Sequence, residues 1–170
     1  MKNVLLILAF LAFAGGVAAQ KDSVRKETPA YLRFPGVPPF KLMLPDNPGA
    51  LYTKADLPKN KAVMLMVFSP DCEHCQHEIE AIIKRIDEFK DVQIVMASTL
   101  PLEKIKAFTD RYNLKQYKNI VAGKDQEYLL PGYYAIHNLP FLAFYTRKKE
   151  LISVFEGNLG VPKILAEFKK

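Results

Sequence analysis

The two cysteines of this chain stand three residues apart, between a segment that predicts a buried strand and one that predicts a helix. The run AVMLMVF (62–68) is continuously apolar and of strand length, which is typical of a strand buried on both faces of a sheet. From Cys75 to Phe89, apolar residues recur every three or four positions, which predicts an amphipathic helix. In this order of strand, Cys-x-x-Cys and helix, the spacing of Cys72 and Cys75 indicates a redox pair.

The rest of the chain continues to alternate between the two patterns. VQIVMAS (92–98) predicts a second buried strand, and LEKIKAFTDRYNL (102–114) predicts a second amphipathic helix. Strands that alternate with helices imply an α/β fold with a parallel sheet at its core. Further elements are expected as a short strand at NIVA (119–122), a partly helical segment at 126–136, a β-hairpin within 140–158 and a last helix at 161–170.

The N-terminus predicts export. Residues 4–19 (VLLILAFLAFAGGVAA) form an apolar segment that follows Lys2 and ends in small residues, so we expect a signal peptide over 1–19 with cleavage after Ala19. No cysteine lies near the cleavage point, which argues against a lipid anchor. The protein is therefore expected in the periplasm if the source is a Gram-negative bacterium, and otherwise to be secreted.

The remaining chain has the length of one domain. Residues 29–48 hold six of the twelve prolines, so this stretch is expected to be extended coil with one short strand at FKLML (40–44). We expect an extended N-terminal lead-in over 20–37 and the domain over 38–170. The formal net charge is +6, with lysines scattered along the sequence, which predicts a basic surface but no nucleic-acid partner.

The start of the predicted helix assigns different roles to the two cysteines. Cys72 falls at the first turn, with Ser69 or Asp71 as the cap, where free backbone N–H groups and the helix dipole favour a thiolate. Cys75 lies one turn later on the same face and nearer the core. Cys72 is therefore expected to be the exposed nucleophile and Cys75 the buried resolving thiol.

Three charged or titratable neighbours are expected to modulate this pair. His74, when protonated, would stabilise the Cys72 thiolate, whereas the carboxylates of Asp71 and Glu73 would oppose it by like-charge repulsion. A structural disulfide is a weak reading of the pair, because so small a loop restricts the unfolded chain little.

The segments VFSPDCEHC (67–75) and HNLPFLAFY (137–145) resemble the thioredoxin superfamily, and among its members the exported TlpA/ResA-like thiol-disulfide oxidoreductases. The resemblance covers roughly residues 38–170. It implies a thioredoxin-like fold, in which a central mixed β-sheet is flanked by helices, with an N-terminal extension and a central insertion at 124–140. It also implies that Pro140 is a cis-proline facing the cysteines.

The resemblance assigns substrate contacts as well. The backbone of Leu139, next to the cis-proline, is expected to pair with an extended substrate segment, and Pro70 is assigned to the same surface. Two departures from the family's pattern concern the site. Asp71 replaces the tryptophan usual before the first cysteine, and Met66 stands where family members commonly bury a carboxylate that relays protons. Glu73 or water is expected to take over the proton transfer.

The expected function is thiol-disulfide exchange with protein substrates, and reduction of the substrate is the favoured direction. The Cys72–Cys75 disulfide would be its redox centre, and no other cofactor is expected. A membrane-linked electron donor is the expected partner, and the protein is expected to be a monomer.

Two alternatives remain open. Cys72, His74, Cys75 and His77 could bind zinc or copper, although four convergent ligands would require the helix to unwind. A peroxiredoxin-type peroxidase would have Ser69 three residues before its attacking cysteine, but Leu65 stands where its proline is expected.

Overall fold

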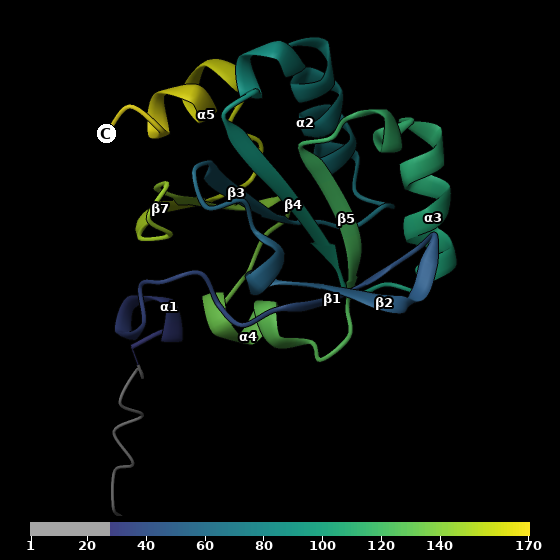
Figure 1. Ribbon diagram of the computed structural model, residues 1–170, viewed down its shortest axis with the longest axis horizontal. Coiled ribbons are helices and arrows are strands. Elements are labelled where there is room, and N and C mark those ends of the chain that lie inside the picture. The colour runs from purple at the N-terminus through teal and green to yellow at the C-terminus, as the bar shows by residue number, and fades with distance from the viewer. Residues whose placement is uncertain (1–27) are drawn as a thin grey trace, which may run out of the picture.

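Seven strands form one mixed sheet at the centre of this computed structural model, which describes residues 28–170 (Figure 1). The sheet has the order β2-β1-β5-β4-β3-β6-β7. Its three middle strands are parallel, and all the outer pairings are antiparallel. The strands are β1 (Lys41–Leu44), β2 (Asn47–Thr53), β3 (Ala62–Val67), β4 (Val92–Ser98), β5 (Ile120–Asp125), β6 (Phe141–Tyr145) and β7 (Leu151–Glu156). The predicted signal peptide lies outside the described residues.

Helices cover both faces of this sheet. One face packs against α2, α3 and α5, and the other against the shorter α1 and α4, which lie below the sheet in Figure 1. The helices are α1 (Ala30–Arg33), α2 (Glu73–Lys84), α3 (Leu102–Arg111), α4 (Leu129–Tyr134) and α5 (Val161–Glu167). No helix within residues 28–170 is both long and apolar enough to cross a membrane.

The predicted strands, hairpin and helices from residue 62 onward are present, but the helix predicted through Phe89 ends at Lys84 and is followed by a 3-10 turn over Ile86–Phe89. The prediction of extended coil for the proline-rich stretch is partly wrong. Pro29 is followed by the short helix α1, and Asn47 begins the strand β2, where extended coil was expected. Pro48 is compatible with a strand here because β2 is at the edge of the sheet, where a missing N–H breaks no central ladder. The lead-in also joins the core: Val37 is buried, and Gly36 pairs with Glu150.

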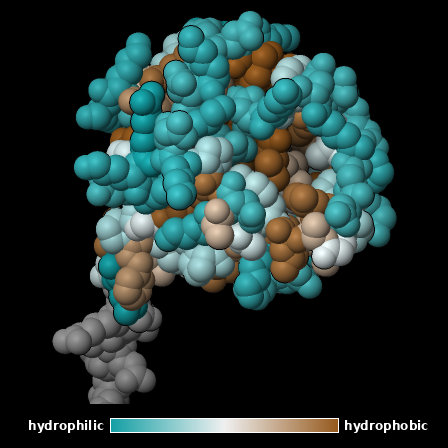
Figure 2. Space-filling view, in the orientation of Figure 1, coloured by the Kyte–Doolittle hydropathy of each residue, from teal (hydrophilic) through white to brown (hydrophobic). Residues whose placement is uncertain are grey.

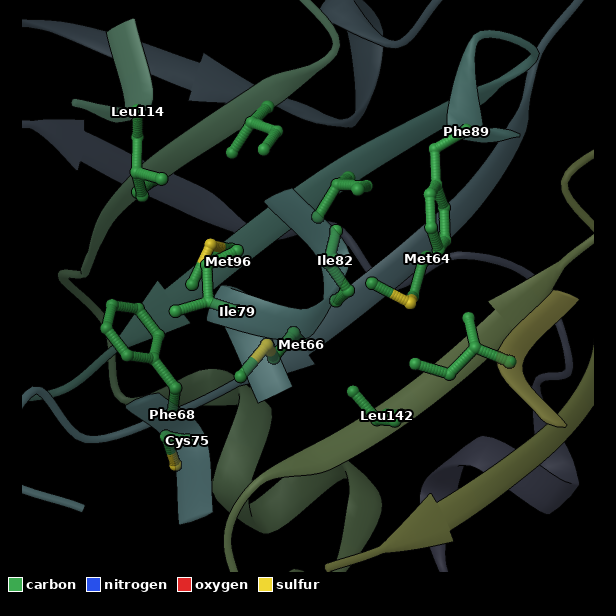
Figure 3. Packing of buried hydrophobic residues seen from close by; sticks show 14 of the residues in the cluster. Met64, Met66, Phe68, Cys75, Ile79, Ile82, Phe89, Met96, Leu114 and Leu142 are labelled. Atoms are coloured by element: carbon green, nitrogen blue, oxygen red, sulfur yellow. The ribbon is translucent and has the colours of Figure 1, made fainter. Parts of the chain in front are cut away.

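The face of the sheet under α2 carries the larger buried cluster (Figure 3). Side chains from β3 and β4 meet the apolar stripe of α2, in which Cys75, Ile79 and Ile82 are fully buried. The view in Figure 2 shows hydrophilic side chains over most of the outer surface of α2 and α3, with hydrophobic ones emerging between the elements. The start of α2 is thereby fixed on a rigid, apolar base.

Candidate active site

A tight turn delivers the cysteines from β3 to α2. Cys72 N–H donates to Ser69 O at 3.0 Å, and Cys72 then adopts an extended conformation as the N-cap residue of α2. Its Sγ accepts a hydrogen bond from Cys75 N–H at 3.4 Å. The expectation that Ser69 or Asp71 caps the helix is therefore wrong, since Ser69 Oγ accepts from Asp71 N–H at 3.2 Å. The sulfur itself occupies the capping position, where the free amides of the first turn favour a negative charge.

The two thiols have very different surroundings. Both are free in this structure, and Cys72 is partly exposed, whereas Cys75 is fully buried. Burial, together with the bond to Cys72, raises the pKa of the Cys75 thiol far above its ordinary value. Cys75 is consequently a protonated thiol at neutral pH, and Cys72 is the thiol that an incoming disulfide can reach.

The loop before β6 faces Cys72 from the other side of the site. Cys72 Sγ lies 3.9 Å from Leu139 O, and the Leu139–Pro140 peptide bond is cis. Pro140 is buried and its carbonyl accepts from Gly157 N–H at 2.7 Å. The structure thus brings Cys72, Cys75, Leu139 and Pro140 together at one end of β3.

The three residues predicted to modulate the cysteine pair have different surroundings in the structure. Asp71 forms an ion pair with Lys104 of α3, with 2.5 Å between Oδ2 and Nζ, so part of its charge is compensated. Glu73 and His74 are exposed in the first turn of α2. Pro70 is buried, and its carbonyl accepts from Gln76 Nε2 at 2.9 Å. Asp71 and Pro70 border a small cavity of about 180 Å³ beside Lys104.

The buried acid on the α2 side of the sheet is Glu78, and position 66 of β3 holds a methionine instead. Met66 is fully buried between Met96 of β4 and Leu142 of β6, so no carboxylate lies under α2 at this position (Figure 3). Glu78, one turn after Cys75 on the same face of α2, is fully buried. Its carboxylate accepts from Leu159 N–H at 2.6 Å and from Gly160 N–H at 3.2 Å.

The sequence analysis did not single out Glu78, although its position in the helical pattern marks it as a buried acid. It falls on the apolar stripe of α2, at the third residue after Cys75, and an acid on a buried stripe is rare unless it has partners. Burial raises the pKa of Glu78, and its two backbone hydrogen bonds counteract this only in part. A carboxylate whose pKa is raised holds a proton more readily than an ordinary one, which is the property a proton acceptor needs.

The potential metal ligands do not form a cluster. Within residues 28–170, no group of three or more His, Cys, Asp or Glu side chains is arranged to hold a metal ion. His74 and His77 are both exposed on α2, and the His74 carbonyl is 3.5 Å from Asn158 Nδ2.

The fold and the cysteine pair define the class of this molecule, a thioredoxin-like oxidoreductase with a Cys-x-x-Cys pair at the start of α2. The profile of the AhpC/TSA family matches residues 36–140, and the chain belongs to this family. No curated protein matches the chain significantly.

Several solved structures share the fold. A thiol:disulfide interchange protein of the thioredoxin family from Chlorobium tepidum is 15% identical, with a TM-score of 0.64 over 84% of this chain and 95% of its own. A secreted Mycobacterium tuberculosis disulfide oxidoreductase homologous to E. coli DsbE is 17% identical, with a TM-score of 0.61 over 75% and 92%. An exposed lipoprotein thioredoxin from Streptococcus pneumoniae is 22% identical, with a TM-score of 0.58 over 77% and 100%.

Proposed function

We propose that this protein is an exported thiol-disulfide oxidoreductase that exchanges disulfides with protein substrates through Cys72 and Cys75. The observation that carries the proposal is the asymmetry of the pair. The Cys72 sulfur is accessible and accepts from an amide at the start of α2, whereas the Cys75 thiol is buried and protonated one turn below. Such an arrangement gives one attacking thiol and one resolving thiol.

As a reductant the pair would work in two steps. The Cys72 thiolate attacks one sulfur of a substrate disulfide, so that a mixed disulfide forms and the second substrate sulfur leaves as a thiolate. Cys75 then loses its proton and attacks Cys72 Sγ, which releases the first substrate sulfur and leaves a Cys72–Cys75 disulfide. The substrate gains two electrons, and the reverse sequence oxidises a dithiol. Glu78, the buried carboxyl group three residues after Cys75 on α2, is proposed to accept its proton.

The substrate and partners follow from this chemistry and from the structural neighbours. The neighbours include a secreted disulfide oxidoreductase and an exposed lipoprotein thioredoxin, which supports protein substrates outside the cytoplasm. The Leu139 backbone beside Cys72 is the group that would pair with an extended substrate segment. Reduction in an oxidising compartment needs a supply of electrons, for which a membrane-linked donor is proposed, and the protein is proposed to act as a monomer.

Trapping experiments test the two roles. Cys75→Ser should accumulate mixed disulfides with partner proteins that dithiothreitol releases, because its resolving thiol is missing. Cys72→Ser should accumulate none, because the remaining thiol is buried. Equal yields of adducts from both variants would refute the assignment of roles.

The reduction potential of the pair tests the direction of transfer. A value near or below about −250 mV would identify a reductant, and one of about −120 to −180 mV an oxidant or isomerase. Two further assays on the same sample address the alternatives. Rapid consumption of hydrogen peroxide through Cys72 would favour a peroxidase, and stoichiometric zinc or copper on thiols that form no disulfide would favour a metal-binding module.

A further inference from the structure

The loop that carries Leu139 is bound by the carboxylate of Glu156. Residues 135–140 contain no helix or strand, and His137 and Asn138 are exposed. Glu156, the last residue of β7, accepts from His137 N–H at 2.9 Å with one oxygen. Its other oxygen accepts from Asn138 N–H at 3.1 Å and from Asn138 Nδ2 at 3.0 Å. The Glu156 side chain therefore binds two consecutive backbone amides and the Asn138 side chain, and so connects β7 to the loop at the site.

The end of β7 holds the loop on both sides of Leu139. Glu156 stands opposite Phe141 in the β6–β7 ladder, and its carboxylate reaches back to the two residues before Leu139. Gly157 N–H donates to Pro140 O at 2.7 Å, directly after Leu139. The Leu139 peptide group, 3.9 Å from Cys72 Sγ at its carbonyl, is fixed between these two attachments.

The carboxylate of Glu156 is bound by these amides. It forms no ion pair with Lys or Arg among the described residues, and its hydrogen-bond donors all belong to His137 and Asn138. Burial opposes ionisation of Glu156, but the hydrogen bonds from His137 and Asn138, together with the charge interaction with His137, outweigh it and lower the pKa below its ordinary value. Hydrogen bonds to an ionised acceptor are roughly twice as strong as neutral ones.

We propose that Glu156 is a positioning residue for thiol-disulfide exchange, which holds the Leu139 backbone beside Cys72 in the geometry that pairs with a polypeptide substrate. The inference rests on the proposed function and narrows its substrate class. Disulfides within an extended peptide depend on Glu156, because they pair with the Leu139 backbone. Small disulfides without a peptide backbone need only the sulfur of Cys72 and do not depend on Glu156.

The test compares two substrates and three variants. The substrates are a short peptide with one disulfide and bis(2-hydroxyethyl) disulfide, and the variants are Glu156→Ala, Glu156→Gln and the control Glu150→Gln. Glu150 is exposed and directly precedes β7, at the end of the strand opposite Glu156. Glu150→Gln changes the net charge by the same amount as Glu156→Gln, at a residue that does not contact the loop.

We expect Glu156→Ala to lower kcat/KM for the peptide by at least about tenfold, since misplacement by about 1 Å can cost up to 100-fold. Glu156→Gln retains one acceptor oxygen and should fall between Glu156→Ala and the wild type. For bis(2-hydroxyethyl) disulfide, and for alkylation of Cys72 by iodoacetamide, all variants should stay within about twofold of the wild type. Amide hydrogen exchange at His137 and Asn138 should be faster in Glu156→Ala than in the wild type. In the control Glu150→Gln it should be unchanged.

The outcomes separate the possible failures. Equal losses on both substrates would overturn the positioning role, because the variant would then have damaged the site as a whole. Unchanged peptide kinetics in Glu156→Ala would overturn it as well. A wild-type protein that exchanges neither disulfide would overturn the proposed function, and the inference with it.

Discussion

The two faces of the central sheet both bury polar groups, but they use them differently. The face under α2 buries the Cys75 thiol and the Glu78 carboxyl group one turn apart. The face under α4 buries the hydroxyl groups of Tyr134 and Tyr145, which hydrogen-bond to each other. The buried hydroxyl groups of one face bond to each other, whereas the buried carboxyl group of the other face bonds to the backbone amides of Leu159 and Gly160.

This difference separates chemistry from structure. Burial raises the pKa of Tyr134 and of Tyr145, so both phenols stay protonated and act only as hydrogen-bonding partners in the core. Glu78 bonds to Leu159 and Gly160, beside the start of α5, and keeps a carboxyl group that can change its protonation state. The partners of each buried polar group, and not its burial alone, decide what the group does.

The strongest test of the comparison places a second acid on the face under α2. In Met66→Asp the carboxylate would lie fully buried between Met96 and Leu142, with no partner to replace water. We expect the free energy of unfolding to fall by about 3–5 kcal/mol at pH 8, as for other unpaired buried charges. Urea denaturation followed by circular dichroism measures the loss, which should shrink at pH 5 as the acid becomes protonated.

Met66→Leu is the matched control, because it conserves volume and should cost less than about 1.5 kcal/mol. If Met66→Asp lowered the free energy of unfolding at pH 8 no more than Met66→Leu does, this face would accommodate a buried carboxylate on β3. Glu78 would then no longer be its distinctive acid, and the comparison between the faces would weaken.

The parts of the fold that the sequence predicted are those with a continuous local pattern. β3 and β4 are unbroken apolar runs, and α2 has a clear stripe, so each was found from its own residues. The pair Cys72 and Cys75 was found for the same reason, since strand, motif and helix are contiguous. β2 was missed because Pro48 and Gly49 break its pattern, and its pairing with β1 is what stabilises it.

The parts of the site that were missed depend on contacts between distant segments. Glu78 bonds to Leu159, 81 residues away, and Glu156 bonds to His137 across the β6–β7 hairpin. An isolated Glu on a predicted helix or strand does not reveal which amide it will meet. The cap of α2 was misassigned for a related reason, because the turn from Ser69 to Cys72 decides which residue leaves the helical conformation.

Replacing Glu78 tests the acid that the face under α2 does contain. Glu78→Ala leaves the amides of Leu159 and Gly160 without their acceptor, and we expect a loss of about 2 kcal/mol in the free energy of unfolding. The pH dependence has a definite sign. Because the pKa of Glu78 is raised in the folded state, its contribution is fully present below the unfolded pKa and is lost as pH rises through the folded pKa.

Glu78→Gln isolates this pH effect, since it keeps an acceptor for one amide and cannot ionise. Urea denaturation from pH 4 to pH 8 should show the decline in the wild type and a flatter profile in the variant. Parallel profiles would mean that Glu78 ionises in the folded protein as it does in the unfolded chain, and its proposed role as proton acceptor for Cys75 would lose its support.

The smallest effects are expected on the opposite face, where Tyr134 and Tyr145 satisfy each other. Tyr145→Phe leaves the Tyr134 hydroxyl buried without its partner and should cost about 1–2 kcal/mol. The double variant Tyr134→Phe/Tyr145→Phe removes both hydroxyls together, and we expect it to recover much of that loss, because no unpaired group remains. Thermal denaturation measures the cycle, and exchange activity should be unchanged throughout. A double variant with reduced exchange activity but normal stability would show that this face also serves the chemistry, and would remove the distinction drawn between the two.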